Sequence, residues 1–245
     1  MARKPVVPPV EHAAPAEPRK AAVEALMRLA ASRRWSEIEL GDIAAEARLP
    51  LATLRGLFPS KLAMLGGFIR QIDDIVLAGA SDDLAGEPAR ERMFDLVMRR
   101  LDAMSPYRQA LRRIAPALRG DPLAMAALNR AAINSWRYLL ASAGIPTEDA
   151  LGPVRLQGAV LLAARVTETW LDDDEPELSR TMARLDRELK TAGWVLSRAE
   201  DVHRLTAPLR GLARALCSGR RPQVRRRERS DESLRREGED YAPAI

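Results

Sequence analysis

Apolar residues recur along most of the chain at the three- and four-residue spacing of amphipathic helices, and no segment alternates as a β-strand does. The longest apolar stripe consists of Leu178, Met182, Leu185, Leu189, Ala192 and Leu196. Polar residues before proline add helix-start signals at Ser105, Asp121 and Glu175. These patterns predict helices near 19–34, 39–46, 50–57, 60–80, 88–104, 106–118, 122–143, 148–171, 176–198 and 201–217. We therefore expect an all-α fold.

The predicted helices fall into a short group and a long group. The short helices make an N-terminal domain over residues 19–65, and the longer ones make a helical bundle over residues 66–217. Outside them lie a proline-rich head at 1–18 and a charged tail at 218–245. Both of these segments are predicted to be disordered, because they cannot bury enough apolar surface to offset the entropy of ordering.

Composition narrows the functional classes. The 245 residues are 47% hydrophobic, which supports a core, and the aromatic content of only 4% favours helix over sheet. A single cysteine, Cys217, excludes a disulfide framework and fits a reducing compartment. The longest uncharged runs are too short to span a bilayer, so we expect a cytoplasmic protein. The sequence contains no zinc-binding pair, phosphate loop or nucleophile motif, so we expect neither an enzyme nor a cofactor.

Charge is unevenly distributed along the chain. The net charge is +5, and most of it belongs to the two ends, so overall basicity says little about nucleic acid. One internal segment is more informative. Residues 47–72 contain no acidic side chain, whereas Arg48, Arg55, Lys61 and Arg70 all fall there.

The same segment has the form of a helix-turn-helix. The two short helices are separated by a turn at 47–50, and the apolar side chains that would face the core are Ile43, Ala44, Leu49, Leu54 and Phe58. Thr53 and Arg55 lie on the opposite side of the second helix. Ser60 can cap the next helix, whose backbone N–H groups could hold a phosphate.

The stretch "DIAAEARLPLATLRGLFPSKLAML" resembles the DNA-binding motif of the TetR-type regulators. The matching positions are Ile43, Ala44, Ala47, Thr53, Leu54, Phe58, Pro59, Ser60 and Lys61. The resemblance implies DNA-binding roles for Thr53, Arg55, Ser60 and Lys61, and we expect Arg48 and Leu51 to contact DNA beside them. The family has glycine where this chain has Arg48, which is less comfortable in a left-handed turn, and a phosphate-contacting tyrosine where it has Arg55. Leu51 could touch a thymine methyl group but cannot hydrogen-bond to a base. The alternative is that this helix-turn-helix is degenerate, does not bind DNA and serves only as a packing unit.

The resemblance also implies the remaining parts of a repressor. Its partner would be double-stranded DNA with a palindromic operator, and it would form a homodimer through the helices at 148–171 and 176–198. The bundle would bind a small apolar ligand, which releases DNA by shifting the population of states. Residues that could line such a ligand cavity are Met125, Leu128, Trp136, Leu161 and Trp170.

The C-terminal half also resembles a second family, the lipid-binding accessory proteins of ubiquinone biosynthesis, whose fold is itself TetR-like. The features that carry this resemblance are Trp136, Ala143-Gly144, Trp170, the acidic turn Asp172–Asp174, Thr181 and Leu185–Arg187. A lipid- or isoprenoid-binding protein with a degenerate helix-turn-helix is therefore the alternative function. In that case the basic amphipathic helix at 201–217 would contact a membrane surface rather than pack on the bundle. The acidic turn suits a helix N-terminus better than a metal site.

Overall fold

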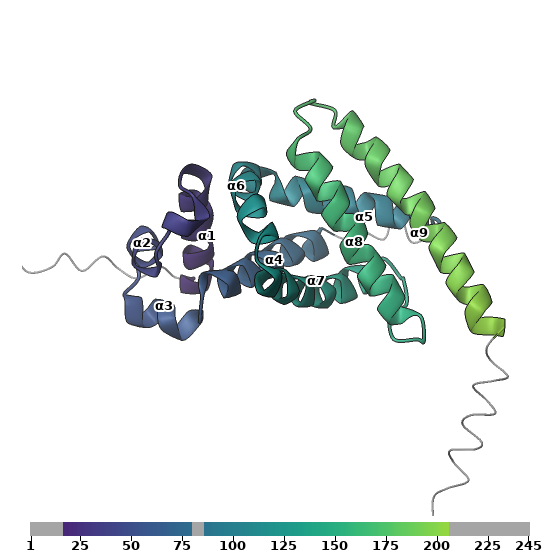
Figure 1. Cartoon of the computed structure of the whole chain (residues 1–245), viewed down its shortest axis with the longest axis horizontal. Helices are drawn as coiled ribbons and strands as arrows, with labels where there is room; N and C mark the ends of the chain where they lie inside the picture. Colours follow the sequence, from purple (N-terminus) through teal and green to yellow (C-terminus); the bar gives the residue numbers. More distant parts are fainter. Residues whose placement is uncertain (1–16, 80–85, 206–245) are drawn as a thin grey trace, which may run out of the picture. The chain divides into compact units, whose positions relative to one another are not determined.

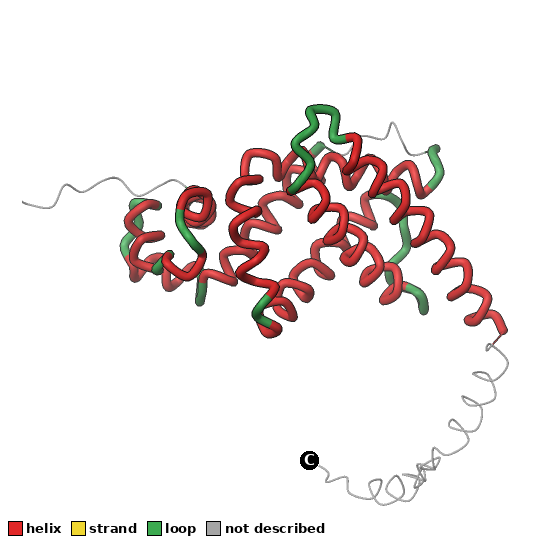
Figure 2. Tube along the Cα trace, turned by 45° about the horizontal axis from the view of Figure 1, so that its top comes forward, coloured by secondary structure: helices red, strands yellow, loops and turns green. Residues whose placement is uncertain are grey.

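The computed structural model describes residues 17–79 and 86–205, with side chains described as far as residue 198. Regular structure in these ranges is helical throughout, as predicted, and loops join the helices (Figure 2). The helices are α1 (Pro18–Ser32), the 3₁₀ helix η1 (Trp35–Glu37), α2 (Leu40–Glu46), α3 (Leu51–Leu57), α4 (Lys61–Ala78), α5 (Ala89–Met104), the 3₁₀ helix η3 (Ser105–Tyr107), α6 (Arg108–Arg119), α7 (Pro122–Ser142), α8 (Gly152–Leu171) and α9 (Ser179–Leu205).

The chain separates into two units, Met1–Glu200 and Asp201–Ile245, and the packing described below is that of the first. Within it, Figure 1 shows α4 leading from the helix-turn-helix of α2 and α3 into the bundle. Because α4 begins at Lys61 and ends at Ala78, it runs through the domain boundary that we expected between residues 65 and 66. The N-terminal helices and the bundle thus share one helix.

Two of the predicted helix limits were wrong. The helix expected from residue 148 begins at Gly152, because Asp149 forms a turn in which its carboxylate accepts the Leu151 N–H at 3.1 Å. The break expected between residues 198 and 201 is absent, since α9 runs without interruption to Leu205. The head at 1–16, residues 206–217 and the tail at 218–245 lie outside the described residues, so the predictions for them stay predictions.

The N-terminal helices pack around α1. This helix contacts α2, α4 and α6, and its inner face is fully apolar. The buried side chains that meet there include Ala22, Val23, Leu26, Ile43, Leu54, Phe58 and Met64. Gly67 of α4 allows the close approach, because a β-carbon at this position would lie 3.0 Å from the Phe58 ring and 3.1 Å from Val23. The α3–α4 corner is thereby held against α1.

The bundle buries a polar cluster that no local sequence pattern indicates. Asp73 of α4, Arg100 of α5 and Ser135 of α7 are all buried. The Arg100 guanidinium donates to Asp73 Oδ1, and the Ser135 hydroxyl donates to the same oxygen at 2.8 Å. The guanidinium also lies 5.8 Å from the centre of the Trp136 ring. Three helices that are distant in sequence are joined at this point.

The connection between α8 and α9 is fixed by the acidic turn. Asp173 is fully buried, and its Oδ2 accepts the Thr181 N–H at 2.8 Å and the Thr181 hydroxyl at 2.7 Å. These bonds cap α9 from outside the helix, and the hydrogen bond from the Thr181 hydroxyl is the main cause that lowers the pKa of the Asp173 carboxyl. From α6, Arg108 donates to the carbonyls of Trp170 and Asp173. The acidic turn therefore serves a helix N-terminus, as expected.

The five apolar residues expected to line a ligand cavity differ widely in their burial. Met125 and Leu161 are 44% and 49% exposed, whereas Trp136 and Trp170 are each only 2% exposed. Leu128 is partly buried against the core. The residues that face inward are their neighbours, Ala124 before Met125 and Leu162 after Leu161. Because successive helical residues point about 100° apart, the sequence shows which helices are amphipathic more reliably than which of two adjacent apolar residues faces inward.

Candidate nucleic-acid interface

The turn between α2 and α3 is a Schellman motif built on Arg48. The Arg48 N–H donates to the Ala45 carbonyl at 3.1 Å, and the Leu49 N–H donates to the Ala44 carbonyl at 2.9 Å. Arg48 has φ of 56°, in the left-handed region that glycine adopts freely and that costs another residue about 1 kcal/mol. Arg48 thus does adopt the strained conformation that the missing glycine would have relieved.

Helix α3 turns most of its surface away from the protein. Only Leu54 is buried, at 1% exposed, and Leu57 is half-buried. The side chains left exposed are those of Leu51, Ala52, Thr53 and Arg55, with Gly56 beside them. Pro50 precedes the helix, so Leu51 at its first position is 56% exposed. A seven-residue helix with one buried anchor is held by its neighbours and leaves a broad outer face for a partner.

Ser60 caps α4 as the sequence predicted. Its hydroxyl oxygen accepts the Ala63 N–H at 3.1 Å, and its backbone is extended. The following residue, Lys61, is turned back toward η1. Its ammonium donates to the Trp35 carbonyl at 2.9 Å and to the Ile38 carbonyl at 2.6 Å, and it lies 4.8 Å from the centre of the Trp35 ring.

The three cations between residues 47 and 61 therefore differ in their partners. Lys61 is occupied by two carbonyls and an aromatic ring. Within the described part of the chain, the side chains of Arg48 and Arg55 form no hydrogen bond or ion pair, and both are exposed. Arg48 and Arg55 are the two cations of this segment whose donors remain for an external acceptor.

The start of α2 is held by the carboxylate of its own residue Asp42 and by Arg33 at the end of α1. The Glu39 N–H donates to Asp42 Oδ2 at 3.0 Å, and Arg33 pairs with the same carboxylate at 3.0 Å. The backbone hydrogen bond from Glu39, and after it the bond from Arg33, lower the pKa of the Asp42 carboxyl. Arg33 is consequently engaged in positioning α2. The sequence offered one signal for this arrangement, the Glu-x-x-Asp spacing of a capping box.

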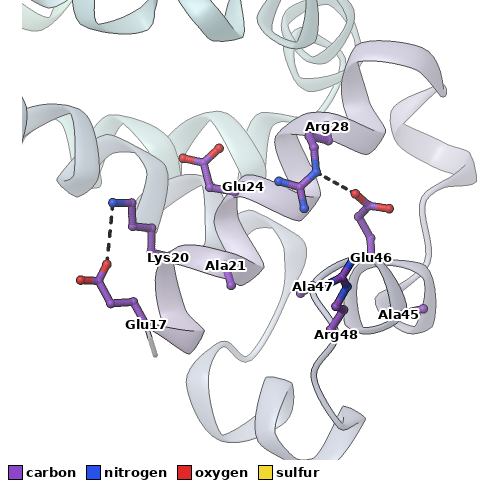
Figure 3. Close-up of a pocket in the computed structure, with 9 residues that line it drawn as sticks. All are labelled: Glu17, Lys20, Ala21, Glu24, Arg28, Ala45, Glu46, Ala47 and Arg48. Carbon is purple, nitrogen blue, oxygen red and sulfur yellow. Dashed lines mark hydrogen bonds and ion pairs between the residues drawn. The ribbon is translucent and has the colours of Figure 1, made fainter. Parts of the chain in front are cut away.

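An open pocket of about 660 Å³ lies between α1 and the end of α2 (Figure 3). The short side chains of Ala21, Ala45 and Ala47 leave this space unfilled. Charged residues make up the rest of the lining, namely Glu17, Lys20, Glu24, Arg28, Glu46 and Arg48. Arg28 of α1 and Glu46 of α2 pair across it at 2.7 Å, whereas Lys20 lies 3.7 Å from Glu17 at the start of α1. No local sequence pattern indicates this pocket, because its lining comes from two helices that meet only in the folded protein.

Glu24 joins α1 to the bundle. Its Oε1 accepts the Gln71 side-chain N–H from α4 at 3.0 Å and the Tyr107 hydroxyl from η3 at 2.6 Å. Burial, and after it the hydrogen bond to Glu24, raise the pKa of Tyr107 to about 12. The Tyr107 ring also meets the Phe68 ring edge-on at 5.0 Å. The phenol therefore stays protonated and can donate this hydrogen bond at neutral pH.

The described part of the chain contains neither a cluster of metal ligands nor a membrane-spanning helix. No three His, Cys, Asp or Glu side chains gather there as metal ligands would. None of the described helices is both long and apolar enough to cross a bilayer. His12 and Cys217 lie outside the described residues.

The residues that carry the resemblance to the ubiquinone-biosynthesis family have structural roles. Trp136 and Trp170 belong to the packed core, and each is covered on one side by an arginine, Arg100 or Arg108. Thr181 is buried on the Asp173 carboxylate. The packing of the bundle accounts for these residues without a bound lipid.

No protein-family model matches the sequence, and no curated protein matches it. Among solved structures, the TetR transcriptional regulator from Nitrosomonas europaea ATCC 19718 is similar with a TM-score of 0.58 and 22% identity, over 72% of this chain and 98% of that one. A TetR transcriptional regulator from Rhodococcus sp. RHA1 is similar with a TM-score of 0.51 and 17% identity, over 72% of this chain and 96% of that one. The lipid-binding resemblance gains no support from these structures. The chain therefore has the fold of the TetR-family transcriptional regulators.

Proposed function

We propose that this protein is a cytoplasmic transcriptional repressor that binds a palindromic operator as a homodimer. The exposed outer face of α3 carries the proposal. Leu54 is the buried residue that anchors this helix, and every other position is at least partly open to a partner. The position of α3, behind a tight turn after α2, is that of a recognition helix in a helix-turn-helix. The fold similarity to TetR-family regulators supports the same function.

The exposed residues of this region divide into two kinds of DNA contact. Arg48 and Arg55 have free donors and would bind phosphates, which fix the register of the helix on the duplex. The first-turn N–H groups of α4 that the Ser60 hydroxyl does not use would bind another phosphate. Thr53 and Leu51 would meet base edges, the first by a hydrogen bond and the second by contact with a thymine methyl group.

We propose that α8 and α9 form the interface of the dimer. Both helices expose large apolar side chains, with Val154 42% and Leu161 49% exposed on α8, and Trp194 60% and Val195 43% exposed on α9. The two helices are neighbours, joined by a hydrogen bond from Arg165 to Glu188 at 3.1 Å (Figure 1). A twofold partner would cover these side chains in a four-helix arrangement and set two α3 helices side by side on DNA.

We propose further that a small, mostly apolar ligand binds the bundle and releases DNA. Such a ligand must bind one of two conformations better than the other, because only differential affinity shifts an equilibrium. Since Trp136 and Trp170 are packed rather than open, side chains would have to move to admit it. The buried cluster of Asp73, Arg100 and Ser135 is one polar group of the bundle that a ligand could displace.

Recovery of genomic DNA fragments on purified protein tests the repressor proposal. The wild-type protein is expected to retain discrete fragments that share a palindrome. Arg48→Ala/Arg55→Ala should no longer retain them, because two phosphate contacts are removed from each subunit. Arg130→Ala is the matched control, since Arg130 is an exposed arginine on α7. Wild-type protein that retains no fragment above background would overturn the proposal.

A further inference from the structure

We propose that Lys61 is a positioning residue that closes the helix-turn-helix into a ring and does not bind DNA phosphate. This inference rests on the proposed function, DNA binding through α3, and it departs from the phosphate contact that the resemblance implies for Lys61. It is carried by the position of the ammonium group, which lies on the backbone of the segment before α2.

The ammonium is bound on three sides. It donates to the Trp35 carbonyl at 2.9 Å and to the Ile38 carbonyl at 2.6 Å, both short enough for a charge-assisted hydrogen bond. The face of the Trp35 ring lies 4.8 Å away, where its quadrupole attracts a cation. The side chain as a whole is half-buried. These groups form a binding site for one ammonium group, and Lys61 of the same chain fills it.

The Ile38 carbonyl needs such a donor because of where it lies. Ile38 is fully buried, and its backbone, at φ −86° and ψ 115°, is extended between the end of η1 and the start of α2. A carbonyl outside a helix does not accept a hydrogen bond from a helical backbone N–H, and a buried carbonyl without a donor is unfavourable. Lys61 provides the donor from a distant part of the sequence.

The contacts with the two carbonyls and the Trp35 ring compete with a DNA phosphate for the same Lys61 ammonium group. To reach a phosphate, Lys61 would give up two charge-assisted hydrogen bonds and the Trp35 ring. It would form instead one contact at the protein surface, where water and salt screen the attraction. The contacts of Lys61 with the two carbonyls and the Trp35 ring, which together we call the clamp, are more numerous and less exposed than a phosphate contact. The clamp is therefore the favoured state with DNA bound as well as without it.

The position of the clamp in the chain gives its consequence for function. Ile38 precedes α2, and Lys61 follows α3, so the contact joins the two ends of the helix-turn-helix. The angle between α2 and α3 is then fixed by the turn at Arg48 on one side and by Lys61 on the other. Lys61 therefore acts on DNA affinity through the placement of α3.

Salt dependence of DNA binding distinguishes the clamp from a phosphate contact. Lys61→Met removes the donors at similar side-chain length, and Arg55→Met is the matched removal of one charge. We expect Lys61→Met to weaken binding by the same factor at every salt concentration and to lower Tm by roughly 5 °C. Arg55→Met should leave Tm unchanged and reduce the slope of log affinity against log salt by about 0.9 for each phosphate that is no longer neutralised. Lys61→Met with an unchanged Tm and the slope of Arg55→Met would overturn the inference.

A second measurement uses the unmodified protein. The chain has four lysines, Lys4, Lys20, Lys61 and Lys190, so acetylation at each can be followed by mass spectrometry. Lys61 is expected to react much more slowly than Lys190, whose side chain is 68% exposed, and to do so equally with and without DNA. A Lys61 that reacts as fast as Lys190 in free protein and is protected by DNA would contradict the clamp. If the wild-type protein bound no DNA, the proposed function would fail, whereas slow acetylation and the lowered Tm of Lys61→Met would still establish the clamp.

Discussion

In the helix-turn-helix, the side chains of Arg48 and Arg55 face solvent without a partner among the described residues, whereas in the bundle Arg100 is buried and paired with Asp73, which Ser135 also contacts. The difference follows from solvation. A charge taken out of water needs a partner inside the protein, while an exposed charge is already stabilised by water and remains open to an external partner. Where the polar groups of this protein are satisfied internally they hold helices together, and where they are left open they mark the surface proposed to bind DNA.

The largest expected effect comes from breaking the buried pair. Asp73→Ala leaves the Arg100 guanidinium buried and uncompensated, and we expect it to reduce the free energy of unfolding by about 3–5 kcal/mol. The matched change in the helix-turn-helix, Arg55→Ala, should alter it by less than about 0.5 kcal/mol. Urea denaturation of the two variants gives the comparison directly. Equal decreases would show that the two regions do not differ in the way proposed.

A smaller effect is expected at the α8–α9 connection. Asp173→Ala leaves the Thr181 N–H and hydroxyl without their acceptor and should cost about 2 kcal/mol. Because hydrogen bonds lower the folded-state pKa of Asp173, its stabilisation is fully present above the unfolded value of about 3.9. It is lost as the pH falls through the lowered folded value. The difference in Tm between wild type and variant should therefore shrink only below about pH 4, and a difference that shrinks at neutral pH would argue against this assignment.

The smallest effect has the opposite sign. Arg48→Gly removes the cost of a left-handed arginine and should raise the free energy of unfolding by about 1 kcal/mol. The same variant should bind DNA more weakly, since it lacks the free guanidinium. Arg48→Ala is the control, because alanine keeps the strain and removes only the charge. Urea midpoints that rise equally in the two variants would place the cost in the side chain and not in the backbone.

Local chemistry made part of this structure predictable. The bounds of α2 and α3 follow from the apolar spacing around Ile43 and Leu54, and the α4 cap follows from a serine before a helical pattern. The position of Arg48 where a left-handed residue is needed could also be anticipated, because the tight turn constrains that backbone whatever the side chain. Each of these predictions depends on residues within a few positions of one another.

The features that were missed depend on contacts between distant residues. Asp73 pairs with a side chain 27 positions away, and Lys61 reaches a carbonyl 23 positions away. No spacing rule connects such partners, because the helices must first pack before they meet. The exposure of Met125 has a related cause, since Met125 is adjacent in sequence to the buried Ala124 and only packing decides which of them faces inward.

The contact between Lys61 and Ile38 bears on how this part of the protein opens. Helices α2 and α3 have seven residues each, which is too short for either to persist alone in water. With the two ends of the segment tied together, neither helix can detach without releasing the other. Their backbone amides should then become accessible to solvent in one shared opening event, so that α2, the turn and α3 form a single cooperative unit.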